Sequence, residues 1–225
     1  MGGYIMRNKW YADKRDLVKW GTMIQLCQEH KLQHIVQVAF LPPESKLPAI
    51  QAKPGRGFNL QQQVWDHFRN VFDIKKLEAK LNIKIRVMAE PFDGSNSSRR
   101  KDYIEKLFRM LSATTNGGKA VLLDPDTGIA PRSGGSSKHV TPEEVRTLWC
   151  ALKPGDWLVL YQHAWRVSRS TWCRLARIRF AKACGVPVCR VRTFTSNRSR
   201  IMATDVALFA IEKPRHHHPG IRANS

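Results

Sequence analysis

Two aspartates separated by one residue follow a short apolar run in the stretch AVLLDPDTGI, residues 120–129. The apolar residues can be buried as a strand, whereas the carboxylates of Asp124 and Asp126 need water, hydrogen bonds or a cation. Carboxylates at a strand end can accept hydrogen bonds from a substrate amine, move protons or bind a metal ion. The letters DPDTG also suit an ordinary turn, because Asp, Pro and Gly are turn formers for steric reasons. Their position directly after an apolar strand favours a functional site.

Two other predicted strands also end in polar groups. Glu90 follows the strand that begins at residue 83, and a later strand ends in Tyr161, Gln162 and His163. Ligands of an open parallel sheet bind outside the carboxyl ends of its strands, so these groups converge on one crevice if the strands are neighbours. His163 would act there as a general base, since its reference pKa is near neutrality, or as a hydrogen-bonded structural residue. The amide of Gln162 would read a base edge or tie down a loop.

Helices and strands alternate around these strand ends. Apolar spacing predicts helices over 11–31, 61–82, 100–112, 142–152 and near 169–184, and strands over 34–41, 83–92, 120–123, 156–165, near 186–193 and over 204–213. Strands separated by helices imply a mostly parallel sheet that is covered on both faces. We therefore expect a single α/β domain over 1–213 with a Rossmann-like, mostly parallel sheet and helices on both faces. A disordered tail is expected over 214–225.

Charge is the most unusual feature of the composition. The chain has 38 Lys and Arg against 18 Asp and Glu, a formal net charge of +20, and an isoelectric point near 10.3. Such an excess destabilises the compact state by self-repulsion unless a polyanion or salt offsets it. Nucleic acid is the first partner that this charge predicts, and an anionic membrane surface is the second. The remaining alternative is a solvated basic surface without a partner.

The positive charge is concentrated in the C-terminal part of the chain, about 165–200. No acidic residue occurs from Trp157 to Thr204. Guanidinium groups bind phosphate in bidentate geometry, and the interleaved Trp165 and Trp172 either stack on bases or belong to the core. We predict that nucleic acid, either DNA or RNA, contacts Arg166, Arg169, Arg174, Arg177, Arg190, Arg192, Arg198 and Arg200.

Several classes of protein are disfavoured by what the chain lacks. Its five cysteines form no C-x-x-C pair, which suits a reducing compartment better than a disulfide framework. No run approaches 18 consecutive apolar residues, and the first ten residues have no apolar signal region. We expect a cytoplasmic protein that does not associate with a membrane.

Three short motifs together resemble a known family. YADKRDLVKW (11–20), LLDPDTGI (122–129) and LVLYQH (158–163) are similar, in order and spacing, to motifs of the bacterial large-subunit ribosomal RNA adenine methyltransferases. They are still more similar to uncharacterised bacterial and phage proteins with LDPD-x-G and YQH motifs. The resemblance implies a class I, Rossmann-like fold, S-adenosylmethionine as cofactor, and a target base that is flipped out of its stack.

The resemblance also implies roles for individual residues. Asp16 and Lys19 match the opening segment of the family, which places Lys19 on the cofactor side, and we expect Glu90 there too. Asp124 and Pro125 match the strand end whose carboxylate and carbonyl accept hydrogen bonds from the target amine.

The chain also departs from the family pattern. Asp126 replaces a second proline, Thr127 replaces an aromatic residue, and Trp20 replaces a histidine. Pro42 and Pro43 follow the first strand, where S-adenosylmethionine-binding folds usually have glycines.

Asp126 keeps other functions open. Asp124, Asp126 and Glu90 would suit Mg²⁺ in a metal-dependent nuclease or phosphohydrolase, and an Asp-x-Asp strand end also begins the haloacid dehalogenase-like phosphatases. A third reading is a non-catalytic nucleic-acid-binding protein on the same scaffold. The favoured prediction is a methyltransferase with Asp124, Pro125, Asp126 and His163 as candidate catalytic residues.

Overall fold

The computed structural model describes residues 14–41, 75–76, 78–88, 90–94, 96–113, 118–131, 136–196 and 203–215. Its helices are α1 (Lys14–His30), α3 (Glu78–Leu81), α4 (Ser97–Ser112), α5 (Pro142–Ala151) and α6 (Arg169–Cys184), with the 3-10 helix η4 (Val188–Arg190). Its strands are β1 (His34–Val38), β2 (Lys84–Met88), β3 (Lys119–Leu123), β4 (Gly128–Ile129), β5 (His139–Val140), β6 (Trp157–His163), β7 (Arg192–Phe194) and β8 (Val206–Glu212).

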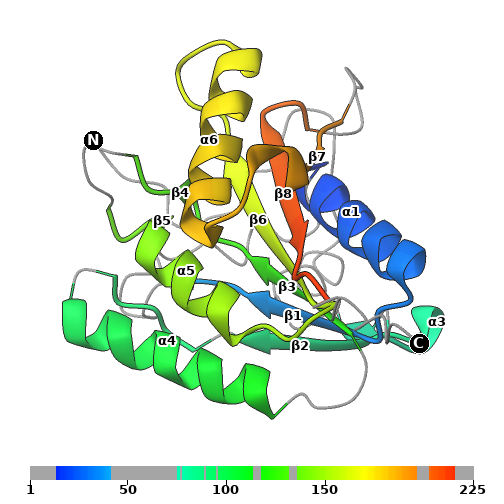
Figure 1. Ribbon diagram of the computed structural model, residues 1–225. Helices are drawn as coiled ribbons and strands as arrows, with labels where there is room; N and C mark the ends of the chain where they lie inside the picture. The colour runs from blue at the N-terminus through cyan, green and yellow to red at the C-terminus, as the bar shows by residue number, and fades with distance from the viewer. Residues whose placement is uncertain are drawn as a thin grey trace, which may run out of the picture.

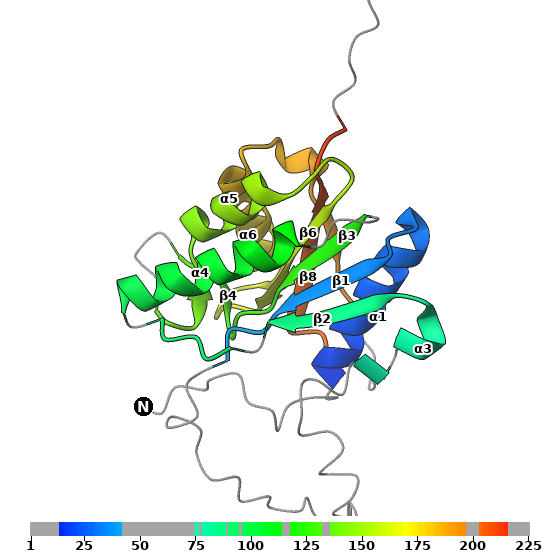
Figure 2. The ribbon, with the colours of Figure 1, turned by 90° about the horizontal axis from the view of Figure 1, so that it is seen from below.

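Six strands form the central sheet, in the order β2-β1-β3-β6-β8-β7. The neighbours from β2 to β6 are parallel, whereas β8 is antiparallel to both β6 and β7. Helices α4, α5 and α6 cover one face of the sheet and α1 covers the other (Figures 1 and 2). The predicted α/β, Rossmann-like fold with a mostly parallel sheet and helices on both faces is therefore confirmed.

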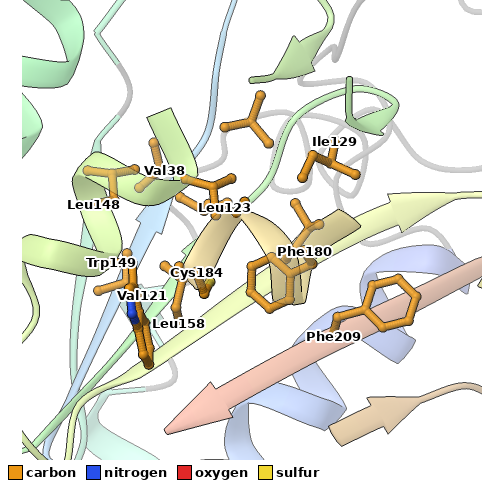
Figure 3. Packing of buried hydrophobic residues seen from close by; sticks show 14 of the residues in the cluster. Val38, Val121, Leu123, Ile129, Leu148, Trp149, Leu158, Phe180, Cys184 and Phe209 are labelled. Carbon is orange, nitrogen blue, oxygen red and sulfur yellow. The ribbon is translucent and has the colours of Figure 1, made fainter. Parts of the chain in front are cut away.

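Alternate residues of the central strands fill two separate hydrophobic cores. In β3, Val121 and Leu123 pack on the side of α4, α5 and α6, while Ala120 and Leu122 pack on the side of α1. Figure 3 shows the first of these cores. Because β3 is buried on both faces, it is apolar without alternation from Ala120 to Leu123.

Local capping explains where the later helices begin and end. Thr141 caps α5 and forms a capping box with Glu144, and Pro142 occupies the first turn, where no backbone donor is needed. Ser168 caps the start of α6, and Gly185 ends it in the left-handed conformation with φ of +67°. These ends agree with the predicted helices.

The order of the strands defines one special position in the sheet. The chain leaves β1 for β2 on one side and later returns to β3 on the other side of β1. The crevice outside the carboxyl ends of β1 and β3 is therefore the topological switch point, where ligands of such sheets bind. Asp124 follows β3 directly, and Phe40, two residues after β1, has a φ of +44°, which is strained for a bulky residue.

Other predicted elements differ from the structure. The strand expected near 186–193 is wrong: Pro187, which lacks a backbone donor, precedes η4, and only the three-residue β7 follows. Of the helix expected over 61–82, residues 61–74 lie outside the described residues, and α3 covers its end. Most of the expected tail, 216–225, also lies outside them.

Candidate functional site

Lys19 lies at the centre of a buried ion-pair network. One turn of α1 separates it from Asp16, so its ammonium donates to Asp16 Oδ1 at 2.8 Å and also reaches Asp124 Oδ2 at 2.9 Å. Lys19 is only 5% exposed. Burial alone would lower the pKa of Lys19, but the carboxylates of Asp124 and Asp16 raise that pKa by more. Lys19 is therefore a charged ammonium that joins α1 to the end of β3.

Asp124 is 1% exposed, and its hydrogen bonds come from the protein itself. Besides Lys19, the amide Nε2 of Gln37 in β1 donates to Asp124 Oδ2 at 2.7 Å. Because that oxygen is an acceptor, the amide must point its nitrogen toward Asp124. The other end of the amide, Gln37 Oε1, is then buried without a hydrogen-bond partner in the described part of the chain. A buried acceptor without a donor lowers the stability of the fold. A donor group from a ligand could form the missing hydrogen bond to Gln37 Oε1.

Tyr161 and His163 extend the network along β6. Lys19 Nζ lies 4.7 Å from the centroid of the Tyr161 ring, and the Tyr161 hydroxyl lies 3.1 Å from Nε2 of His163. Burial is the main reason that the pKa of His163 is lowered to about 4; the cations Arg15 and Lys19 act in the same direction, and Asp205 opposes them. His163 is therefore neutral at pH 7 and a weak base, which fits its structural role better than general-base catalysis.

Gln162 holds the turn that follows Asp124. Its Oε1 accepts from the backbone N–H of Ile129 at 3.0 Å, and its Nε2 donates to the carbonyl of Thr127 at 2.6 Å. Gly128 has a φ of +107°, and a Cβ there would lie 2.2 Å from Gln162 Oε1. The LDPD-x-G and YQH motifs are thus in contact, and Gln162 ties down the turn rather than facing a base. In the same turn Pro125 is buried and Asp126 is half-buried.

Glu90 does not join this cluster. Strand β1 lies between β2 and β3, so the end of β2 is not adjacent to Asp124. Glu90 instead forms an ion pair with Lys106 of α4, and its side chain is 49% exposed. The expected convergence is wrong for Glu90. No group of three His, Cys, Asp or Glu side chains within the described ranges could hold a metal ion, so Asp124, Asp126 and Glu90 do not form the Mg²⁺ site of the alternative reading.

The predicted nucleic-acid-binding arginines fall into three groups. Arg166, Arg174 and Arg190 are exposed and Arg177 is half-buried. Two others contact their own chain: Arg169 donates to the carbonyl of Ser196 at 2.7 Å, and Arg192 donates to Glu29 at 2.8 Å. Arg198 and Arg200 lie outside the described residues.

The two tryptophans of the basic portion have different environments. Trp172 is 2% exposed and belongs to the core under α6. Trp165 is half-buried against the same core, and the guanidinium of Arg179 lies 4.5 Å from its ring centroid. Of these two tryptophans, Trp165 is therefore the one that lies near the surface.

Sequence reasoning did not select Gln37 or Asp205. A glutamine inside the apolar run HIVQVAF, residues 34–40, was an available signal, since a polar residue in a buried strand needs a partner. Asp205, which pairs with Arg15 at 2.6 Å, had no comparable signal because its partner is 190 residues away.

No model of a known protein family matches the chain, and no curated protein is significantly similar to it in sequence. Fold and site together define a Rossmann-like α/β protein with a buried ion-pair network at its switch point. Within the described ranges, no helix is both long and apolar enough to cross a membrane.

Proposed function

We propose that this protein is a nucleic-acid base methyltransferase that uses S-adenosylmethionine and acts in the cytoplasm. The observation that carries the proposal is the contact between Lys19 and Asp124. These residues belong to two of the three motifs that resemble the adenine methyltransferases, and they are 105 positions apart in sequence but 2.9 Å apart in space. The contact lies at the switch point, where a Rossmann-like sheet binds its ligand.

The cofactor fits one unusual feature of this site. Gln37 Oε1 is a buried acceptor without a donor, and it lies beside Asp124 at the end of β1. A ligand with an amine could satisfy that atom once a neighbouring side chain moves, because Gln37 is 1% exposed, whereas Glu90 is already paired with Lys106. S-adenosylmethionine would supply an electrophilic methyl group at its sulfonium.

The residues of the chain would divide the remaining tasks. Lys19, held by Asp16 and Asp124, fixes the position of α1 against the ends of β1 and β3. Asp124 and the carbonyl of Pro125 would accept hydrogen bonds from the target amine, and Gln162 keeps the turn in shape. Asp126 has no assigned step in methyl transfer.

A second candidate function follows from the burial of Asp124. Its side chain is 1% exposed and Oδ2 already accepts from Lys19 and Gln37, so an amine reaches it only after a neighbouring side chain moves. This observation favours a non-catalytic nucleic-acid-binding protein on the same scaffold. A Mg²⁺-dependent nuclease is less favoured, because its three carboxylates are not assembled.

Calorimetric titration of S-adenosylmethionine separates these functions. We expect saturable binding, followed by transfer of a labelled methyl group to RNA or DNA that is lost in Asp124→Asn. Asp156→Asn is the matched control. Asp156 forms an ion pair with buried Lys119 where β3 and β6 begin, which is the end of the strands opposite to Asp124. Absence of binding at millimolar cofactor would exclude the methyltransferase. Cleavage that requires Mg²⁺ and disappears in Asp126→Asn would support the nuclease instead.

A further inference from the structure

Helix α6 carries a set of cations on its outward side. Trp172, Ala176 and Phe180 recur every four residues on its buried side. Arg174 and Lys182 are offset from them by two residues, about 200° around the helix, and both are exposed. We call the following exposed residues in and next to α6 the α6 cationic surface: Arg166, which precedes the helix, Arg174 and Lys182 within it, and Arg190 in η4.

The charge of this surface is not balanced locally. Helix α6 contains no acidic residue, so no i,i+4 ion pair can form along it. Within the described ranges, none of Arg166, Arg174 and Arg190 forms an ion pair, whereas Arg192 is occupied by Glu29. The exposed cations therefore complement a polyanion.

The same surface begins beside the candidate site. The backbone N–H of His163, the last residue of β6, donates to the carbonyl of Thr127 in the turn after Asp124. Arg166 follows three residues later, and α6 starts at Arg169. Between them Val167 is 52% exposed, an apolar side chain at the end of the cationic surface nearest the turn.

We infer that the α6 cationic surface binds the sugar-phosphate backbone of a nucleic-acid strand and directs that strand to the turn at residues 124–128. Phosphate contacts fix position and orientation, while apolar side chains contact bases. In this arrangement the cations along α6 hold phosphates, and Val167 contacts a base at the end where the turn lies. Arg169 and Arg192 belong to the protein's own structure and not to the interface. This inference rests on the nucleic-acid part of the proposed function and does not require S-adenosylmethionine.

The test is a salt titration of binding to a labelled 20-nucleotide single strand, measured by fluorescence anisotropy. Arg166→Ala/Arg174→Ala should bind more weakly than wild type. The slope of log affinity against log salt should fall by roughly 1.4, about 0.7 for each lost phosphate contact. Arg109→Ala/Lys153→Ala is the matched control, since it removes two exposed cations outside the α6 cationic surface and should leave the slope unchanged. Val167→Ser should weaken binding without changing the slope.

Each alternative outcome has a distinct meaning. Equal losses in the two double variants would overturn the inference, because binding would then depend on net charge alone. Tighter binding to phosphatidylserine vesicles than to the strand, lost in Arg166→Ala/Arg174→Ala, would assign this surface to a membrane. If wild type binds no nucleic acid, the proposed function fails as well. If wild type binds the strand as expected but does not bind S-adenosylmethionine, the methyltransferase proposal is contradicted and the role of the α6 cationic surface is still supported. Equal melting temperatures of all variants exclude loss of folding as the cause.

Discussion

The site consists of buried polar side chains that form hydrogen bonds with one another, except at Gln37 Oε1. Lys19 neutralises part of the charge of Asp16 and Asp124, and Gln37 completes the hydrogen bonds of Asp124. The sequence predicted that Asp124 and Lys19 are important, because one follows an apolar strand and both lie in motifs. It could not predict that they bond to each other, since a contact over 105 positions depends on the packing of α1 against the sheet.

His163 provides a prediction at this scale. Its pKa is about 4 in the folded protein against 6.5 for an ordinary histidine, so the unfolded chain binds a proton between these values and the folded chain does not. The contribution of His163 to the free energy of unfolding should therefore be complete above pH 6.5 and be lost as the pH drops toward 4. This loss amounts to about 2–3 kcal/mol. Urea unfolding at pH 7 and pH 4.5 measures it.

His163→Gln supplies the comparison for that measurement. The variant keeps a hydrogen-bonding group near Tyr161 but has no proton to gain, so its stability should fall less over the same pH range. His139, whose pKa burial also lowers, is present in both proteins and cancels. Equal pH dependence in the two proteins would contradict the assigned burial of His163.

Secondary-structure elements were predictable where their ends are set locally. The limits of α6 follow from Ser168 and Gly185, and those of α5 from the capping box at Thr141. The region after α6 was not predictable in the same way. Val188 and Val191 are typical strand residues, but Pro187 and the turn of η4 leave only a short edge strand. The two-residue strands β4 and β5 are too short for any periodic pattern.

The turn between β3 and β4 yields the prediction at this scale. Gly128→Ala would place a methyl group against Gln162 and force a non-glycine residue to a φ of +107°. We expect a loss of about 2–4 kcal/mol in the free energy of unfolding, measured in urea. Gly185→Ala is the control, because its φ is also positive, at +67°, but no atom lies within 4 Å of the added Cβ.

The comparison measures how much more Gly128→Ala costs than the replacement of a glycine in the left-handed helical region with open space around it. Gly185→Ala should cost only about 1–2 kcal/mol. A Gly128→Ala protein as stable as the control would mean that Gln162 moves away freely and does not hold the turn.

At the scale of the whole molecule, alternation of strands and helices was enough to predict the α/β class. The order of the strands was not, because it is decided by which helices pack on which face. That gap explains why Glu90 does not join the cluster: its convergence with Asp124 required the strands to be neighbours, and β1 lies between β2 and β3.

Net charge is a property of the whole molecule, and it supports the last prediction. With +20 the exposed cations repel one another, whereas the buried pairs Lys19–Asp124 and Lys119–Asp156 are attractive. Salt screens exposed charges much more than buried ones, so added salt should relieve the repulsion and leave these attractions nearly intact. The free energy of unfolding in urea, an uncharged denaturant, should rise on the order of 1 kcal/mol between 0.02 and 0.3 M NaCl.

A variant of the α6 cationic surface locates the source of this salt effect. Removing Arg166, Arg174, Lys182 and Arg190 together lowers the repulsion, so the quadruple alanine variant should gain less from salt than wild type. If stability falls with salt, exposed ion pairs such as Arg192–Glu29 outweigh the repulsion. The cations would then be balanced within the folded protein itself, and the physical reason for expecting a polyanion as partner would be lost.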